Sequence, residues 1–328
     1  MANSLLGIKP HQVSRDLRGY SVMLYGTPKS GKTTTACQFP KHLLLAFEKG
    51  YNAIPGAIAK PINNWREFRN VLIELKDDEV KQAYETIIID TVDIAYDYCV
   101  DYICNQNGVD TIGDLAYGKG YALVAKEFDT CIRKILNMDY GLVLISHSTD
   151  RVERDEHGEE YTRMEPTLDK RGRLICERTC DIVGMSRPTK NDDGSVTTKL
   201  FMRETPRYVA GSRFKYIDSE IEFSYQNLVD AIRRAIDKEA EMCGKDAVTD
   251  DRQNVYQAED DTDLNFDALK EEFASLVGQL MAKSETNRNK ISKIVTEYLG
   301  AGKKVGDADE TMAPQIKLIN NELKFLLK

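Results

Sequence analysis

The sequence predicts an α/β domain with a mainly parallel sheet, followed by an acidic linker and a small helical domain. Three observations predict this organisation. Short apolar runs alternate with longer amphipathic segments through residues 1–240, and a glycine-rich turn follows the first of these runs. Residues 241–263 are rich in acids, and residues 264–328 contain further amphipathic segments. We therefore expect one large domain and one small domain, joined by the acidic stretch.

The first half of the chain alternates strand-like and helix-like patterns. The run TIIID is apolar up to its last residue, which is typical of a strand buried on both faces of a parallel sheet. Four such runs predict strands at residues 21–25, 43–47, 86–90 and 141–147. Apolar residues at helical spacing predict helices at residues 65–85, 93–104 and 121–138. This alternation favours parallel strands joined by helices.

The pattern changes after residue 147. Residues 148–172 are polar and rich in turn residues, so they predict a long loop or a hairpin. Two further strands are expected at residues 180–186 and 197–205, with the turn NDDGS between them, and a helix at residues 225–243 closes the domain. The linker holds eight acids and two bases from Glu241 to Asp263, and three helices are expected beyond it, at residues 266–281, 288–300 and 313–328.

Composition excludes several classes of protein. A net charge of −8 over 328 residues argues against a protein that binds nucleic acid over its whole surface, so any such contact must be local. The seven cysteines are scattered without a CxxC pair, which argues against a zinc site or a disulfide framework and favours free thiols in a reducing cytoplasm. No apolar run approaches the ~20 residues that span a membrane, and no secretory signal is visible. We expect a soluble cytoplasmic protein with no membrane contact.

The turn after the first strand has the pattern of a phosphate-binding loop. Gly26 to Thr33 read GTPKSGKT, which fits G-x-x-x-x-G-K-[ST]. Glycines let the backbone fold tightly with its N–H groups pointing inward, and the following helix adds its positive dipole end. A plain glycine loop is the alternative, but the flanking strand and helix favour a site for ATP or a related nucleotide. The residues assigned to nucleotide binding are Gly26, Thr27, Pro28, Lys29, Ser30, Gly31, Lys32, Thr33 and Thr34.

Polar residues at the ends of other strands complete the predicted site. Asp90 ends the run TIIID and is expected to hold Mg²⁺ together with Thr33; an Asp after a strand can instead cap a helix, a role that Asp93 fits better. Glu48 could orient or deprotonate an attacking water, and the alternative is a solvated charge. His147 could sense the terminal phosphate, or it could be an ordinary hydrogen-bonded histidine at a strand end.

Four stretches carry a family resemblance. GTPKSGKTTTACQFP, LLLAFEKGY, TIIIDTVD and LVLISHS, in this order, resemble the RecA/RadA ATPase core. They resemble more closely the phage-encoded RecA-like ATPases of the Sak-type group, AAA family proteins associated with single-strand annealing and recombination. The resemblance covers residues 15–240. It implies a P-loop fold, ATP hydrolysis coupled to single-stranded DNA binding, a homo-oligomeric ring or filament, and, for a phage-encoded protein, work in the host cytoplasm.

The resemblance also implies roles for single residues. Glu48 falls where the family keeps its catalytic glutamate, and His147 falls where RecA has a glutamine that reports nucleotide state to the DNA-binding loop. Arg213 falls where a basic residue reaches the ATP of the neighbouring subunit, although Gly211 stands where the family often has a lysine. The predicted catalytic set is therefore Lys32, Glu48, Asp90, His147 and Arg213.

Two segments are candidates for a DNA surface. Tyr117, Lys119 and Tyr121 lie among glycines, and rings beside a cation on a mobile backbone suit a sequence-tolerant single-strand site. The run LDKRGR concentrates positive charge, so phosphate contacts are expected from Lys170, Arg171 and Arg173. The alternatives are a loop with surface tyrosines and a solvated charged hairpin.

The sequence leaves three functions open. The first is an ATP- and magnesium-dependent ATPase of DNA recombination or annealing. The second is a nucleotide-gated loader that recruits replication proteins, because the acidic linker and separate tail suit such a role. The third is a small-molecule kinase in which residues 149–173 form a lid. Cationic residues in the tail predict a contact with DNA or with a single-strand-binding protein, or else they are only the solvated faces of helices.

Overall fold

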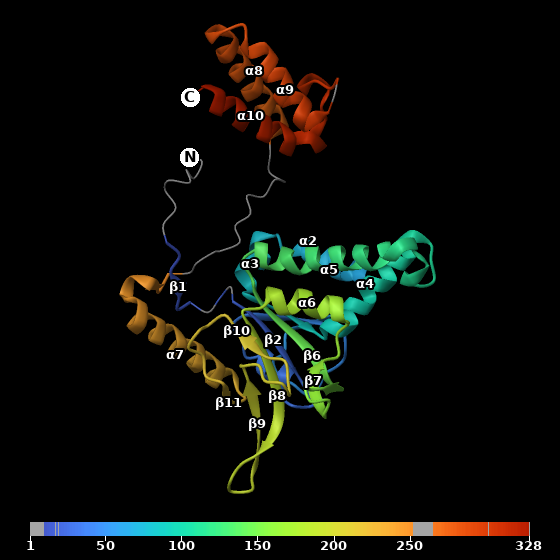
Figure 1. Ribbon diagram of the computed structural model, residues 1–328, viewed down its shortest axis with the longest axis vertical. Helices are drawn as coiled ribbons and strands as arrows, with labels where there is room; N and C mark the ends of the chain where they lie inside the picture. The colour runs from blue at the N-terminus through green and yellow to red at the C-terminus, as the bar shows by residue number, and fades with distance from the viewer. Residues whose placement is uncertain (1–9, 17, 19, 252–264, 301, 328) are drawn as a thin grey trace. The chain divides into compact units, whose positions relative to one another are not determined.

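The strand that precedes the phosphate loop lies in the middle of a sheet (Figure 1). The described residues form a 10-stranded sheet in the order β11-β9-β8-β2-β6-β5-β3-β4, with β7 beside β6 and β10 beside β8. The central strands β8, β2, β6, β5, β3 and β4 are parallel to one another. Strands β7, β9, β10 and β11 pair antiparallel to their neighbours. The strands are β2 (Ser21–Gly26), β3 (His42–Ala46), β4 (Ala59–Pro61), β5 (Thr86–Asp90), β6 (Gly141–Arg154), β7 (Glu160–Pro166), β8 (Ile182–Lys190), β9 (Val196–Phe201), β10 (Gly211–Ser212) and β11 (Glu220–Glu222).

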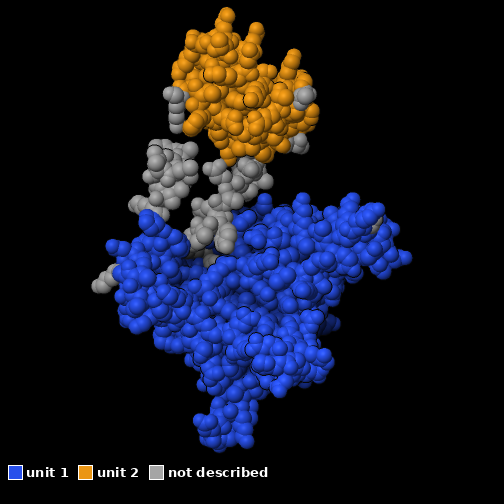
Figure 2. Space-filling view, in the orientation of Figure 1, with its two compact units in different colours: residues 1–256 blue, residues 257–328 orange. Residues whose placement is uncertain are grey.

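The computed structural model describes residues 10–16, 18, 20–251, 265–300 and 302–327. The chain divides into two compact units, residues 1–256 and residues 257–328, which Figure 2 colours separately. Among the described residues, no helix combines the length and the apolar character that a bilayer span requires.

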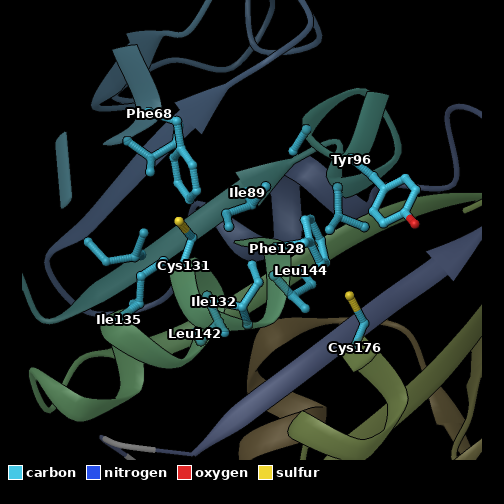
Figure 3. Packing of buried hydrophobic residues seen from close by; sticks show 14 of the residues in the cluster. Phe68, Ile89, Tyr96, Phe128, Cys131, Ile132, Ile135, Leu142, Leu144 and Cys176 are labelled. Atoms are coloured by element: carbon cyan, nitrogen blue, oxygen red, sulfur yellow. The ribbon is translucent and has the colours of Figure 1, made fainter. Parts of the chain in front are cut away.

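One face of the sheet is covered by four helices. They are α2 (Trp65–Glu74), α4 (Val92–Asn107), α5 (Lys119–Asn137) and α6 (Lys170–Thr179), which lie together on one side of the strands (Figure 1). Phe128 of α5 packs against the rings of Trp65 and Tyr96, and Figure 3 shows it beside Ile89 and Leu144 of the sheet. This core holds the helices in place over one face of the sheet.

The opposite face packs against α1 (Lys32–Ala36) and α7 (Tyr225–Cys243). Alternate residues of each central strand point to the two faces: Ile87 and Ile89 belong to the core under α5, whereas Ile88 packs with Leu228 and Ile232 of α7. Both faces of β5 are therefore buried, which explains why its sequence is continuously apolar. The parallel core and its helices confirm the predicted α/β fold.

Several element boundaries differ from the prediction. Residues 65–85 form two helices, because the side chain of Asp77 accepts a hydrogen bond from the backbone N–H of Glu79 and starts α3 (Asp78–Ala83). Strand β6 does not end at residue 147 but continues to Arg154 and pairs with β7, so the polar stretch is a hairpin followed by α6. Strand β9 ends at Phe201, four residues before the predicted end.

The first part of the predicted acidic linker is structured, which corrects the expected boundary. Helix α7 continues to Cys243, and β12 (Val248–Thr249) pairs in parallel with β1 (Val13–Ser14). Arg15 adds ion pairs to Asp237 of α7 and to Asp250, so one acid of the stretch that we expected to be flexible instead binds the N-terminal segment. The rest of the predicted linker, from residue 252, lies outside the described residues up to residue 264.

The second unit contains the three helices that the sequence predicts. They are α8 (Phe266–Lys283), α9 (Asn287–Leu299) and α10 (Ala313–Leu327). Their apolar faces enclose a core of their own that includes Leu280, Ile316, Ile319 and Leu323.

Candidate functional site

The phosphate loop closes around the ammonium group of its own lysine. Gly26 ends β2 with φ 152°, and a Cβ there would lie 2.0 Å from the carbonyl oxygen of Ser186, so only glycine fits against β8. Gly31 has φ 88° at the start of α1. Lys32 is buried, and its Nζ donates to the carbonyl oxygens of Gly26 at 3.0 Å and Thr27 at 2.9 Å. Burial lowers the pKa of Lys32, while Asp90 and Glu48 act in the opposite direction.

The loop is fixed to the strand beside it. Ser30 and Ser186 share a hydrogen bond of 2.8 Å between their hydroxyls, and the Ser186 hydroxyl also donates to the Tyr25 carbonyl at 3.2 Å. Helix α1 has only 5 residues, so its dipole is weaker than the sequence led us to expect. The anion-binding character of the loop therefore depends mainly on its own N–H groups and on Lys32.

The two predicted magnesium residues are in contact. The hydroxyl of Thr33 donates to Oδ2 of Asp90 at 2.8 Å. Strand β6 separates β5 from β2, so Asp90 lies on the next strand but one and not on an adjacent strand, yet the carboxyl ends of these parallel strands meet at one edge. Asp90 is 2% exposed, and desolvation by burial raises its pKa to about 6; the Thr33 hydrogen bond lowers this pKa, and Glu48 raises it.

The donors at this edge fit a magnesium ion held together with phosphate. Oδ1 of Asp90 is buried and has no hydrogen-bond partner among the described residues. Within the same part of the chain, no group of three or more His, Cys, Asp or Glu side chains could enclose a metal without other ligands. Magnesium prefers this kind of incomplete protein site, because substrate phosphates and waters supply its remaining oxygens. Thr33 and Asp90 would hold the ion.

Glu48 and His147 complete the group around the loop. Nε2 of His147 lies 3.5 Å from Oε2 of Glu48. His147 pairs in register with Gly26, and it lies in the middle of β6, not at a strand end as expected, at the point where this strand leaves the main sheet for the hairpin. A Cβ on Gly50 would lie within 4 Å of Glu48, Asp90 and Thr33, so the backbone of Gly50 lies over all three.

A cavity of about 450 Å³ joins these groups and includes residues that sequence reasoning missed. Gly50, Ala53 and Ile54 belong to the segment between β3 and β4, which runs across the site. The signal in the sequence was the glycine and proline content of KGYNAIPG directly after Glu48, which is typical of a loop that contacts a ligand. The lining consists of Pro28, Lys29, Gly31, Lys32, Thr33, Thr34, Glu48, Gly50, Ala53, Ile54, Asp90, Ile145 and His147.

Asp93 is not the helix cap that the sequence suggested. Thr91 holds the N-cap position of α4, and the Asp93 carboxylate accepts hydrogen bonds from Ser146 at 3.0 Å and Thr167 at 2.6 Å. Burial raises the pKa of Asp93, and these two hydrogen bonds oppose the rise. Thr167 also donates its N–H to the His147 carbonyl. Asp93 therefore joins α4, β6 and the segment before α6.

Arg213 lies near the amino end of β2, opposite the end that carries the phosphate loop. Its guanidinium pairs with Asp181 at 2.9 Å, and Asp181 accepts from the N–H of Ser21 at the start of β2. The phosphate loop follows the opposite end of β2, about 17 Å away at ~3.3 Å per residue. The structure therefore does not bring Arg213 to the nucleotide cavity of its own chain.

The two predicted DNA segments meet on the helical face. Arg171 at the start of α6 lies over the ring of Tyr121 on α5, 4.4 Å from its centroid. Tyr117 is fully exposed with φ 57°, and Lys119 and Lys170 are exposed beside these helix starts. Arg173 is different: it is largely buried and pairs with Glu165 and Glu177, so it is not available for the predicted phosphate contact.

The fold and the site together define a P-loop ATPase domain. An AAA domain family, AAA_24, matches residues 18–214, and the chain belongs to this family. It is 31% identical to the SPbeta prophage-derived uncharacterized protein YorG of Bacillus subtilis (strain 168), over 100% of this chain and 99% of that protein. Among solved structures, a KaiC-like protein from Pyrococcus horikoshii OT3 matches 58% of this chain and 80% of its own, with 15% identity and a TM-score of 0.32.

Proposed function

We propose that this protein is an ATP- and magnesium-dependent ATPase that binds single-stranded DNA during phage-type recombination or single-strand annealing. The observation that carries the proposal is the grouping of Thr33, Asp90 and Glu48 around a loop that encloses Lys32. This arrangement offers a metal position, a phosphate-binding cation and a carboxylate for water at one edge of the sheet. The prophage origin of the relative in Bacillus subtilis supports the phage context.

Each side chain has a separate task in this proposal. Lys32 exchanges its two loop carbonyl partners for the terminal phosphates of ATP, and the loop N–H groups bind the remaining phosphate oxygens. Thr33 and Asp90 would hold Mg²⁺, and the bound ion would neutralise developing phosphate charge. Glu48 orients the attacking water and accepts its proton, while His147 keeps the Glu48 carboxylate turned into the cavity.

The surface formed by α5 and α6 supports the DNA part of the proposal. Arg171, Tyr121, Tyr117, Lys119 and Lys170 combine rings with cations on neighbouring helix starts. Such a surface binds a single strand by stacking and by phosphate contacts, without regard to base sequence. Asp93 and Thr167 connect the start of α6 to the strand that carries His147, so nucleotide state has a route to this surface.

Assembly into a ring or filament would give Arg213 a function. Because it lies at the edge opposite the phosphate loop, it can act only on the ATP of a neighbouring copy, where it would stabilise phosphate charge.

Measuring ATP hydrolysis with and without single-stranded DNA tests the proposed function. We expect turnover that requires Mg²⁺ and rises with single-stranded DNA, and a decrease of about 100-fold or more in Lys32→Ala. Lys60→Ala on β4 is the matched control, because this exposed lysine pairs with Glu74 and is not among the residues that line the cavity, so the change should leave turnover unchanged. Turnover that does not respond to DNA would argue against the recombination role, and normal turnover in Lys32→Ala would refute the site.

A nucleotide-gated loader is the second candidate, and one observation favours it. Helix α10 of the second unit exposes Leu318 and Phe325, which are 48% and 78% accessible among the described residues. Apolar side chains at this spacing lie on one helical face and could contact a replication partner such as a single-strand-binding protein. Negligible turnover even on DNA, together with stable capture of that partner, would favour the loader over the ATPase.

A further inference from the structure

A second groove lies between the β6–β7 hairpin and the segment that follows β9. One wall is the β6–β7 hairpin (Figure 1), and the other consists of Arg187 of β8 and of the segment between β9 and β10 that contains Thr205, Arg207 and Tyr208. The groove has a volume of about 540 Å³. None of its residues belongs to the nucleotide cavity or to the surface formed by α5 and α6, and its lining is Asp150, Thr162, Met164, Arg187, Thr205, Arg207 and Tyr208.

The two arginines of this groove are held by aromatic rings and not by acids. The guanidinium of Arg187 lies 5.4 Å from the ring centroid of Phe201, and that of Arg207 lies 5.5 Å from the centroid of Tyr161. Neither forms an ion pair with any residue that the structure describes. Rings hold a guanidinium in place without neutralising its charge, so both groups keep their donors for a ligand.

Neighbouring arginines show that this arrangement is not general on the hairpins. Arg151 pairs with Glu165, Arg154 with Glu160, and Arg163 with both Glu165 and Glu204. These pairs neutralise the cations that the sequence places along β6 and β7. Asp150 is the one acid in the groove lining, so two guanidinium groups face one carboxylate there.

One wall of the groove is hydrogen-bonded to the strand that carries the phosphate loop. The Tyr25 hydroxyl donates to the carbonyls of Met164 at 3.2 Å and Val209 at 2.5 Å, and Tyr25 directly precedes Gly26. Arg187 directly follows Ser186, which is bonded to Ser30 of the loop. A ligand in the groove would therefore lie next to elements that nucleotide binding holds in place.

We propose that Arg187 and Arg207 form a second contact for the phosphodiester backbone of single-stranded DNA. Two preorganised guanidinium groups beside the ring of Tyr208 match a phosphate with its adjoining base, because arginine binds phosphate through paired donors and any base can stack on a ring. This inference rests on the proposed function, and it extends the path of the strand from the surface formed by α5 and α6 to the groove. Asp150 opposes the contact by charge repulsion.

Binding of a fluorescent oligothymidylate to the full-length protein, measured by anisotropy over a salt series, tests the groove. The double variant Arg187→Gln with Arg207→Gln should weaken binding by about 10-fold or more. It should also reduce the slope of the logarithm of the binding constant against the logarithm of the salt concentration by roughly one, because fewer counterions are released. Asp150→Asn should strengthen binding. Arg154→Gln is the matched control, because this arginine lies on the same hairpin but is already paired, and it should bind like the unmodified protein.

The outcomes separate the groove from the proposed function. If the unmodified protein does not bind the oligonucleotide, both the DNA-binding function and the groove are refuted. If it binds and the double variant binds equally well with the same salt dependence, only the groove is refuted. A double variant that binds DNA normally but hydrolyses ATP more slowly without DNA would assign the arginines to a neighbouring copy's nucleotide, against this proposal. The double variant Arg187→Lys with Arg207→Lys keeps both positive charges. If it restores the salt dependence of binding and its melting temperature is unchanged, the result supports the groove contact and argues against a folding defect.

Discussion

At the residue scale, the site places an almost fully buried carboxylate in the nucleotide cavity. Asp90 is 2% exposed and its side chain accepts a hydrogen bond from Thr33, while Glu48 adds a second negative charge nearby. A buried carboxylate of this kind costs stability in the ligand-free protein, because desolvation disfavours its ionised form. The cost is recovered only when a cation binds. Asp90 therefore serves function at the expense of stability, and replacing its charge should change the free energy of unfolding in a predictable direction.

We expect Asp90→Asn to stabilise the ligand-free protein and to abolish turnover. The pKa of Asp90 is about 6 in the folded protein, whereas the ordinary pKa of an aspartate is 3.8. The folded state thus holds its proton more tightly, and the penalty grows as pH rises from about 4 to about 6 and is complete above that. At neutral pH the difference between these two pKa values corresponds to a destabilisation of at most about 3 kcal/mol. We therefore expect Asp90→Asn to raise the free energy of unfolding by about 1–3 kcal/mol. Urea unfolding of both proteins measures it: the gain should shrink near pH 4, and a variant that is less stable at neutral pH would contradict the argument.

At the element scale, sequence patterns predicted the strands and helices well where burial determines the pattern. The run TIIID could be assigned because both its faces are apolar, and 225–243 was assigned correctly because α7 has one apolar face. The hairpin of β6 and β7 could not be separated from a loop, because its exposed half carries charges that form pairs only in three dimensions. For the same reason, the sequence could not distinguish Arg171, which lies over a ring, from Arg173, which is buried against Glu165.

The two arginines of α6 give a matched prediction. Arg171→Ala should weaken binding of single-stranded DNA by about 5- to 20-fold at unchanged stability, because it removes a cation and its contact with Tyr121. Arg173→Ala should instead lower the free energy of unfolding by about 2–4 kcal/mol, because it removes an ion-pair partner from the buried Glu165 carboxylate. Anisotropy and urea unfolding on both variants check this, and the reverse pattern would show that Arg173 is the DNA contact.

At the scale of the whole molecule, the nucleotide site belongs to one unit. Every residue that lines the cavity lies between Pro28 and His147, and the second unit encloses a separate core under α8, α9 and α10. The sequence located this division, because acids without large apolar residues mark the stretch after α7. It could not place the boundary, because the pairing of β1 with β12 joins residues more than 200 positions apart and leaves no local pattern.

Two truncations separate these boundaries. A chain of residues 1–256 keeps β12, the contact of Val248 with the core under α7 and the ion pair between Arg15 and Asp250, so it should fold and retain Lys32-dependent turnover. A chain of residues 1–240 ends inside α7 and loses all three, and we expect its free energy of unfolding to fall by about 2–4 kcal/mol. Urea unfolding compares the two chains, and turnover per folded molecule should be equal in both because neither cut removes a cavity residue. Equal stability would mean that β12 contributes nothing and that the domain already ends at residue 240. Loss of turnover in the longer chain would mean that the second unit takes part in hydrolysis.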